Sequence, residues 1–204
     1  MRVQLRIVAG SLRGRKLTCD VHDGLRPTPQ MVREALFSIL GNAVPGRPFL
    51  DVFAGTGANG LEALSRGASD VSFVERDLPL GNAIQKYLQA WKVDRTGRVL
   101  RGDVYRWAER WRAPTKPVTI FLSPPFEDYE KRPEDLRRLV DDLITKMADG
   151  SVIAIQGEKS PGYDGLLVGR TWDQRKYGRN LLAFFVKGDD EDAAGAVIPH
   201  EEEE

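Results

Sequence analysis

The order of apolar segments along the chain is the feature that most restricts its fold. Short apolar stretches typical of buried β-strands alternate with stretches in which apolar residues recur at helical spacing. The predicted strands cover residues 49–53, 71–74, 98–100, 118–122 and 151–156, and the predicted helices 59–65, 79–91, 105–111 and 133–147. This alternation predicts an α/β fold with a mostly parallel sheet and helices on both faces. Sheets of this kind bind ligands beyond the carboxyl ends of their strands.

Segments at both ends of this alternation have other patterns. Residues 2–9 alternate polar and apolar side chains, and residues 15–17 can return as a second strand, which predicts an N-terminal β-hairpin. Thr28 precedes Pro29 and is predicted to be the N-cap of a helix that ends at Gly41. Residues 172–176 and 181–187 predict a closing antiparallel hairpin.

The formal net charge of zero conceals an uneven distribution of charge. Residues 189–204 carry eight acids and no base, which leaves 30 bases against 22 acids in residues 1–188. The acidic stretch is predicted to be a disordered tail, after a hairpin extension over residues 1–27 and one domain over 28–188. A basic front end favours a polyanionic partner. Its bases are Arg2, Arg6, Arg13, Arg15, Lys16, Arg26 and Arg33.

Composition excludes several classes of protein. Cys19 is the single cysteine of the 204 residues and there are two histidines, so an internal disulfide or a cysteine-rich zinc site is excluded. No apolar run approaches the roughly 18 residues of a membrane span, and polar residues follow Met1 where a secretory signal would be apolar. We expect a cytoplasmic monomer without a metal or a membrane partner.

A glycine-rich turn carries the sharpest chemical signal. Gly55, Gly57 and Gly60 follow the predicted strand that contains Asp51 and open the next helix, so the backbone can pass close to a ligand. Glu75 ends the following strand, where a carboxylate can accept hydrogen bonds from two ribose hydroxyls. The arrangement predicts a nucleoside cofactor without choosing between NAD and S-adenosylmethionine. No lysine follows the last glycine, which argues against a phosphate-binding P-loop.

Two further strand ends bear on the cofactor. Asp103 could accept a hydrogen bond from an adenine amine, cap the following helix, or do both. Ser123-Pro-Pro-Phe126 ends the fourth strand of the alternation, and its prolines stop the strand and fix an extended backbone. Carbonyl groups there can point at a ligand amine, while Phe126 offers a face on which a base can stack. A hydride-transfer site has no use for this group, so the sequence favours S-adenosylmethionine over NAD.

At these positions the sequence resembles the class I Rossmann-like methyltransferases that modify exocyclic amines. Their motif at this strand end is Asp or Asn followed by Pro-Pro and Tyr or Phe. More closely, the chain resembles the bacterial 16S ribosomal RNA guanine-N2 methyltransferases, which act on guanine 966. The matching stretches are residues 6–17, 24–28, 33–37, 51–68, 102–103 and 124–126.

The resemblance implies a seven-stranded sheet and methyl transfer from S-adenosylmethionine to a guanine N2 amine in 16S rRNA or the assembling small subunit. It implies a basic hairpin, with Arg13, Arg15 and Lys16, that helps hold RNA. The segment with Arg26 and Thr28 would lie near the cofactor and the target base. The predicted cofactor residues are Asp51, Phe53, Gly55, Gly57, Gly60, Glu75 and Asp103, and the predicted catalytic residues are Ser123, Pro124 and Phe126.

Ser123 departs from the family pattern, which has Asp or Asn at this position. A serine hydroxyl can accept a hydrogen bond from the target amine, but it is shorter and neutral, and the Pro124 carbonyl could supply a second acceptor. Losing a charge-assisted bond would cost about 1–2 kcal/mol, which predicts a slowed enzyme. The alternatives are a non-catalytic RNA-binding or assembly module that keeps the cofactor pocket and, more remotely, an NAD-dependent oxidoreductase. Asn59 also replaces an apolar residue of the family.

Overall fold

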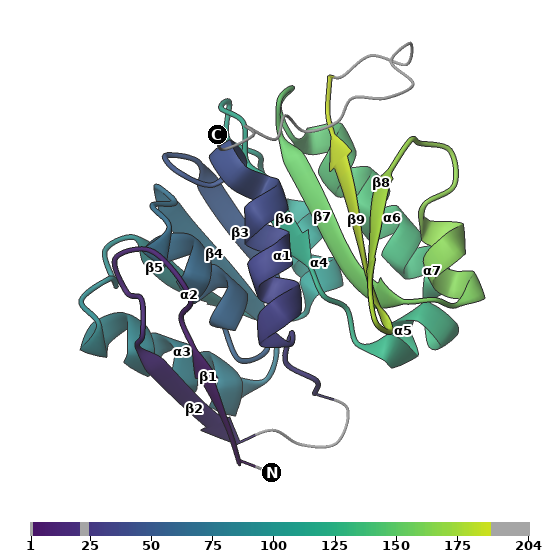
Figure 1. Cartoon of the computed structure of the whole chain (residues 1–204). Helices are drawn as coiled ribbons and strands as arrows, with labels where there is room; N and C mark the ends of the chain where they lie inside the picture. The colour runs from purple at the N-terminus through teal and green to yellow at the C-terminus, as the bar shows by residue number, and fades with distance from the viewer. Residues whose placement is uncertain (1, 21–24, 189–204) are drawn as a thin grey trace, which may run out of the picture.

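The computed structural model describes residues 2–20 and 25–188. Within them, the central element is a seven-stranded sheet with the order β5-β4-β3-β6-β7-β9-β8 (Figure 1). Its strands are β3 (Pro48–Val52), β4 (Asp70–Glu75), β5 (Gly97–Arg101), β6 (Thr119–Leu122), β7 (Val152–Glu158), β8 (Asp173–Tyr177) and β9 (Asn180–Val186).

The pairing of these strands confirms the predicted fold class. Strands β3 to β7 are mutually parallel, and β9 pairs antiparallel with both β7 and β8. The chain first builds outward from β3 through β4 to β5, and then returns to place β6 on the other side of β3. The strand order therefore reverses at β3, which is where open α/β sheets form a ligand crevice at their carboxyl ends.

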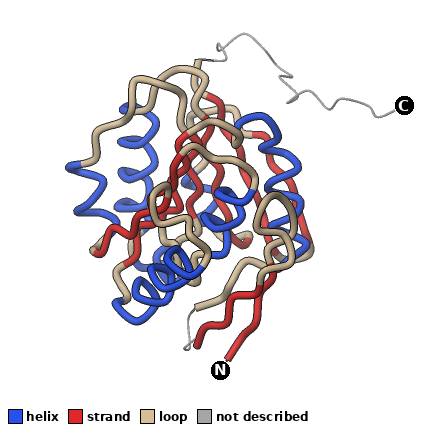
Figure 2. Tube along the Cα trace, turned by 90° about the vertical axis from the view of Figure 1, so that its left-hand side faces the viewer, coloured by secondary structure: helices blue, strands red, loops and turns tan. Residues whose placement is uncertain are grey.

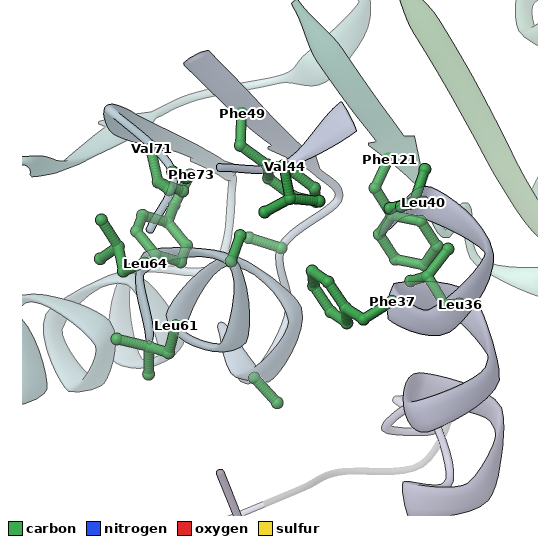
Figure 3. Packing of buried hydrophobic residues seen from close by; sticks show 14 of the residues in the cluster. Leu36, Phe37, Leu40, Val44, Phe49, Leu61, Leu64, Val71, Phe73 and Phe121 are labelled. Atoms are coloured by element: carbon green, nitrogen blue, oxygen red, sulfur yellow. The ribbon is translucent and has the colours of Figure 1, made fainter. Parts of the chain in front are cut away.

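Helices cover both faces of the sheet (Figure 2). One face carries α1 (Gln30–Leu40), α2 (Ala58–Ser65) and α3 (Leu78–Ala90), and the other carries α4 (Val104–Arg110), α5 (Phe126–Lys131), α6 (Pro133–Lys146) and α7 (Pro161–Leu166). A short 3-10 helix, η1 (Gly41–Ala43), follows α1. In the layer that contains α1, the ring of Phe37 stacks on the ring of Phe49 in β3, with the ring centroids 6.0 Å apart (Figure 3).

The N-terminal hairpin is formed by β1 (Arg2–Arg6) and β2 (Lys16–Asp20), which pair antiparallel. It is shorter at its first strand than the predicted 2–9, because Val8 and Ala9 donate their backbone N–H groups to the Glu62 carboxylate at 2.8 and 3.0 Å. Leu17 is fully buried in the core cluster of the first helical layer. Gly10 (φ +80°) passes so close to α2 that a Cβ would lie 1.8 Å from the Ser65 carbonyl oxygen. The hairpin is thus anchored on α2.

Two further details of the sequence prediction were wrong. The short helices α5 and α7 were not predicted, since six residues give too little periodicity to recognise. Thr28 is not the N-cap of α1: Pro29 occupies that position, and no side chain caps the helix. The Thr28 side chain instead turns inward to Gln156, 128 residues away in the sequence.

The predicted acidic tail lies outside the described residues. Within residues 2–20 and 25–188, none of the helices is both long enough and apolar enough to cross a bilayer.

Candidate active site

A cavity of about 450 Å³ opens at the carboxyl ends of β3, β4, β6 and β7. Eight residues that the sequence analysis predicted for the functional site line this cavity. These are Arg26, Phe53, Gly55, Glu75, Asp103, Ser123, Pro124 and Phe126. Two ends of the cavity can be distinguished. Glu75 is the last residue of β4 and Asp103 follows β5, whereas Ser123 and Phe126 follow β6.

The glycine turn supports the cavity from behind. Gly57 has φ +76°, and a Cβ there would lie 2.7 Å from the Ile84 side chain. A Cβ on Gly60 would lie 2.2 Å from the ring of Phe73, so α2 can pack on β4 only without one. Gly57 and Gly60 do not line the cavity themselves. Their part in the structure is to allow the close packing that fixes the turn.

Asp51 also lies behind the turn, and not on the cavity wall. Its side chain is fully buried, and Oδ2 accepts the backbone N–H of Gly60 at 2.8 Å. Among the described residues, Oδ1 has no hydrogen-bond partner. Burial raises the pKa of Asp51 to about 7; the Gly60 hydrogen bond opposes this rise and the nearby charge of Glu75 adds to it.

Glu75 holds the turn from the neighbouring strand. Its Oε2 accepts the Gly55 N–H at 2.6 Å, and its Oε1 accepts the Asp77 N–H at 2.7 Å. Burial raises the pKa of Glu75, although these two hydrogen bonds offset part of the effect. The carboxylate therefore reaches the cavity already fixed in position.

The cavity is apolar between its acidic groups. Phe53 has φ +64°, and its ring meets Tyr105 edge-on with the centroids 6.0 Å apart. Asp103 is the N-cap of α4, because its carboxylate accepts the Arg106 N–H at 3.1 Å, and it also lines the cavity. Both functions considered for Asp103 are thus compatible with its position.

The charges of this half fit S-adenosylmethionine. The cofactor carries a positive sulfonium, a positive ammonium and a negative carboxylate group, and three acids, Glu75, Asp77 and Asp103, line the cavity together with Arg76. The Oδ1 of Asp51, which has no hydrogen-bond partner among the described residues, adds a buried acceptor behind the turn. The same acids disfavour the negatively charged pyrophosphate of NAD, because like charges repel at short range. Glu75, Asp103 and Phe53 are the residues that would hold the nucleoside.

The other half is built on the end of β6. Ser123 is half-buried and donates its backbone N–H to the Val52 carbonyl at 3.3 Å. Within the part of the chain that the structure describes, its hydroxyl has no hydrogen-bond partner. Pro125 is the N-cap position of α5, so the half-buried Phe126 begins that helix. The Pro-Pro segment after β6 thus places the Ser123 hydroxyl and the Phe126 ring at the cavity.

Sequence reasoning missed a buried polar chain beside Ser123. Asn59 Nδ2 donates to Thr28 Oγ1 at 3.1 Å, and the Thr28 hydroxyl donates to Gln156 Oε1 at 2.7 Å. Gln156 Nε2 then donates to Asn180 Oδ1 at 3.1 Å, and both of these residues line the cavity. Thr28 is buried, so its side chain is placed inside the protein and not on an RNA-binding surface. The one available sequence signal was polar residues in otherwise apolar segments, Asn59 in α2 and Gln156 in β7.

The predicted basic residues fall into three environments. Arg13, Arg15 and Lys16 are exposed on the hairpin, and the Arg15 guanidinium lies 5.7 Å from the ring centroid of Trp91. Arg26 lies at the mouth of the cavity. Arg33 does not belong to the basic surface: it is fully buried, with Nη2 donating to the Arg6 carbonyl at 2.7 Å.

Comparison with known proteins agrees with this architecture. Ribosomal RNA small subunit methyltransferase D of Escherichia coli (strain K12) is 34% identical over 151 residues, which are 74% of this chain and 70% of that protein. The solved structure of the Escherichia coli protein yhhF matches with a TM-score of 0.74 and 32% identity, covering 91% of this chain and 98% of that one.

A more distant structure shares the fold. It is a 16S rRNA N2 methyltransferase of T. thermophilus in complex with AdoMet and guanosine, with a TM-score of 0.70 at 24% identity, covering 92% of this chain and 50% of that one. A model of the family described as Conserved hypothetical protein 95 matches residues 5–186. The chain therefore belongs to the Conserved hypothetical protein 95 family, which confirms the resemblance to the 16S rRNA methyltransferases that its motifs indicated.

Proposed function

We propose that this protein is an S-adenosylmethionine-dependent methyltransferase that modifies the exocyclic N2 amine of a guanine in 16S rRNA. The observation that carries the proposal is one cavity with two chemically different ends. Glu75 and Asp103 at one end suit a nucleoside cofactor, and Ser123 to Phe126 at the other suit an amine on a flat base. The Escherichia coli relative is named a ribosomal RNA small subunit methyltransferase, which supports the rRNA substrate.

Bound S-adenosylmethionine supplies an activated methyl group. In the proposed reaction, the Ser123 hydroxyl and the Pro124 carbonyl accept hydrogen bonds from the two N–H groups of the target amine. This orients the nitrogen lone pair toward the methyl carbon, and the ring of Phe126 stacks the base. As the nitrogen bonds to the methyl carbon, the bond from that carbon to sulfur would break to leave a neutral thioether, and the amine would release one of its two protons. Positioning of this kind can account for a large part of the acceleration, so a neutral acceptor at residue 123 is compatible with turnover. The guanine must leave its stack, because the amine cannot be reached within one.

The RNA is proposed to lie across the hairpin and the cavity mouth. Arg13, Arg15 and Lys16 are exposed and carry the charge that would contact backbone phosphates. We propose 16S rRNA in the assembling small subunit as the partner and a monomer as the active form, in the cytoplasm. No metal takes part in the proposed reaction, since the sulfonium activates the methyl group by itself.

Methyl transfer to small-subunit particles tests the proposal. The particles are taken from cells that lack the guanine-N2 modification, incubated with the full-length protein and labelled S-adenosylmethionine, and digested to nucleosides. We expect label in N2-methylguanosine and none when the particles are already modified. Saturable cofactor binding without any methyl transfer would contradict the proposal and favour the non-catalytic RNA-binding module.

A further inference from the structure

One arginine occupies the base-binding end of the cavity. The guanidinium of Arg26 lies 5.1 Å from the ring centroid of Phe126, and its Nη1 is 3.7 Å from Oε1 of Glu158. All three residues line the cavity. A flat group with N–H donors therefore lies over the ring proposed to hold the target base, with one of its nitrogens near a carboxylate.

We propose that Glu158 is the specificity-determining residue that accepts the N1–H of the target guanine, and that Arg26 holds this place while RNA is absent. The inference rests on the proposed function. The N1, C2 and N2 atoms of guanine, together with N3, form a planar guanidine-like edge. On this edge N1–H and the N2 amine are neighbouring donors, whereas N1 of adenine is an acceptor. The contacts that Arg26 makes with Phe126 and Glu158 are thus ones that guanine itself can make.

The register of the sheet places Glu158 correctly for this contact. Leu122, the last residue of β6, pairs with Ile155 of β7, so Ser123 lies beside Gln156, two residues before β7 ends. Glu158 follows Gln156 by two residues and shares its face of β7, because side chains alternate along a strand. An amine held at Ser123 would therefore leave the adjacent N1–H directed along this face, toward the carboxylate.

A second arginine can hold the carboxylate when Arg26 departs. Nε of Arg179 lies 3.3 Å from Oε1 of Glu158, and the Glu158 side chain is only 29% exposed. Arg179 can thus remain the cationic partner of Glu158 both before and after Arg26 moves away. Arg26 has a side chain that is 57% exposed, so it can swing outward when a base takes its place on Phe126. In that position its charge becomes available to an RNA phosphate.

The base analogue 2-aminopurine separates amine chemistry from N1 recognition, because it keeps the 2-amino group but has no hydrogen on N1. Small-subunit RNA is assembled with guanine or 2-aminopurine at the target position and methylated in a single turnover at saturating S-adenosylmethionine. For the wild type we expect guanine RNA to react about ten-fold faster or more, since a charged hydrogen bond is lost with the analogue. In Glu158→Gln the amide can donate to N1 of the analogue, and the preference for guanine should largely disappear.

Two control variants show whether a change in the ratio of the guanine rate to the 2-aminopurine rate is specific to the Glu158 carboxylate. Glu158→Asp keeps a carboxylate and should retain the preference for guanine. Glu130→Gln removes an exposed acid of α5 that does not line the cavity, and should leave the ratio at the wild-type value. An unchanged ratio in a folded Glu158→Gln would overturn the inference while leaving the proposed function intact. A wild type that methylates neither RNA would overturn the proposed function and this inference with it.

Discussion

The carboxylate of Glu75 accepts the backbone N–H of Gly55 at 2.6 Å, although twenty residues separate the two in the sequence. The contact joins the end of β4 to the turn that follows β3. It is possible because the two strands are parallel neighbours, so their carboxyl ends lie at the same edge of the sheet. The group proposed to bind ribose therefore also fixes the turn proposed to receive the rest of the cofactor.

We expect Glu75→Ala to weaken S-adenosylmethionine binding strongly. The variant loses an acceptor for the ribose hydroxyls and leaves the N–H groups of Gly55 and Asp77 without this partner. A charged hydrogen bond contributes about 1.5–3 kcal/mol, so the dissociation constant should rise by about ten-fold or more. Isothermal calorimetry measures the change, with the exposed Asp94→Asn as a control. Unchanged affinity in a folded Glu75→Ala would exclude this role.

Cofactor binding should depend on pH through Asp51, whose pKa burial raises to about 7. Between about pH 4 and 7 the native protein holds a proton that the unfolded chain has released, so this group's contribution to stability falls as pH rises through that window. A positively charged ligand favours the ionised carboxylate. Binding should therefore release a proton, and affinity should rise from pH 6 to pH 8.

Calorimetry in buffers of different ionisation enthalpy counts the released protons. Asp51→Asn keeps an acceptor for the Gly60 N–H and removes the titration, so its affinity should change much less with pH. Proton release that is equal in the wild type and Asp51→Asn would show that another group titrates.

Glu62 should be among the most important residues for stability. It is fully buried and accepts the N–H groups of Val8 and Ala9, while its Oε2 lies 3.8 Å from Nε of the buried Arg33. Glu62→Ala leaves that guanidinium without its carboxylate, and the free energy of unfolding should fall by about 3–5 kcal/mol. Urea denaturation compares it with Glu34→Ala, which removes an exposed acid and should cost less than about 0.5 kcal/mol. Similar losses in both variants would contradict the proposed importance of the buried pair.

The hairpin bases should act on RNA binding far more than on folding. We expect Arg13→Ala/Lys16→Ala to weaken binding of small-subunit RNA and to flatten its salt dependence, because fewer counterions are released. The melting temperature should hardly change, since both side chains are exposed. Adding Arg15→Ala should lower stability by about 0.5–1 kcal/mol, because this guanidinium lies on Trp91.

The matched control is Arg137→Ala/Arg138→Ala, which removes two exposed bases of α6 on the opposite face of the sheet. Filter binding over a range of salt concentrations gives the slopes. Equal slopes for the hairpin variant and this control would mean that the hairpin has no special contact with RNA.

The parts of the fold that the sequence predicted are those determined by local pattern. The parallel strands and the helices between them follow from apolar periodicity, and the turn at Gly55 to Gly60 follows from residue types that tolerate close packing. Glu75 could be assigned to the same site because adjacent parallel strands end at one edge. Asp103 could be predicted as a helix cap because the capping contact reaches only three residues ahead.

The polar contacts of Thr28, Gln156 and Asn180 could not be predicted in this way. Gln156 and Asn180 meet because β9 pairs with β7, a register that no local pattern reveals. The sequence around Thr28 is typical of a helix N-cap, but its hydroxyl donates a hydrogen bond to Gln156, 128 residues away. Arg33 was counted as a surface base because charge patterns do not show which cation a buried carboxylate such as Glu62 will hold.

In the proposed reaction, the hydroxyl of Ser123 and the Pro124 carbonyl hold the target amine in one cavity with the cofactor. This arrangement is tested most directly by single-turnover methylation of unmodified small-subunit particles by the wild type and Ser123→Ala, at saturating S-adenosylmethionine. In a site closed to water, Ser123→Ala leaves an amine N–H unpaired, so we expect the rate to fall by about ten-fold or more with cofactor affinity nearly unchanged. Ser123→Asn or Ser123→Asp should keep or raise the rate, since either supplies an acceptor. Equal rates for the wild type and Ser123→Ala would contradict the account.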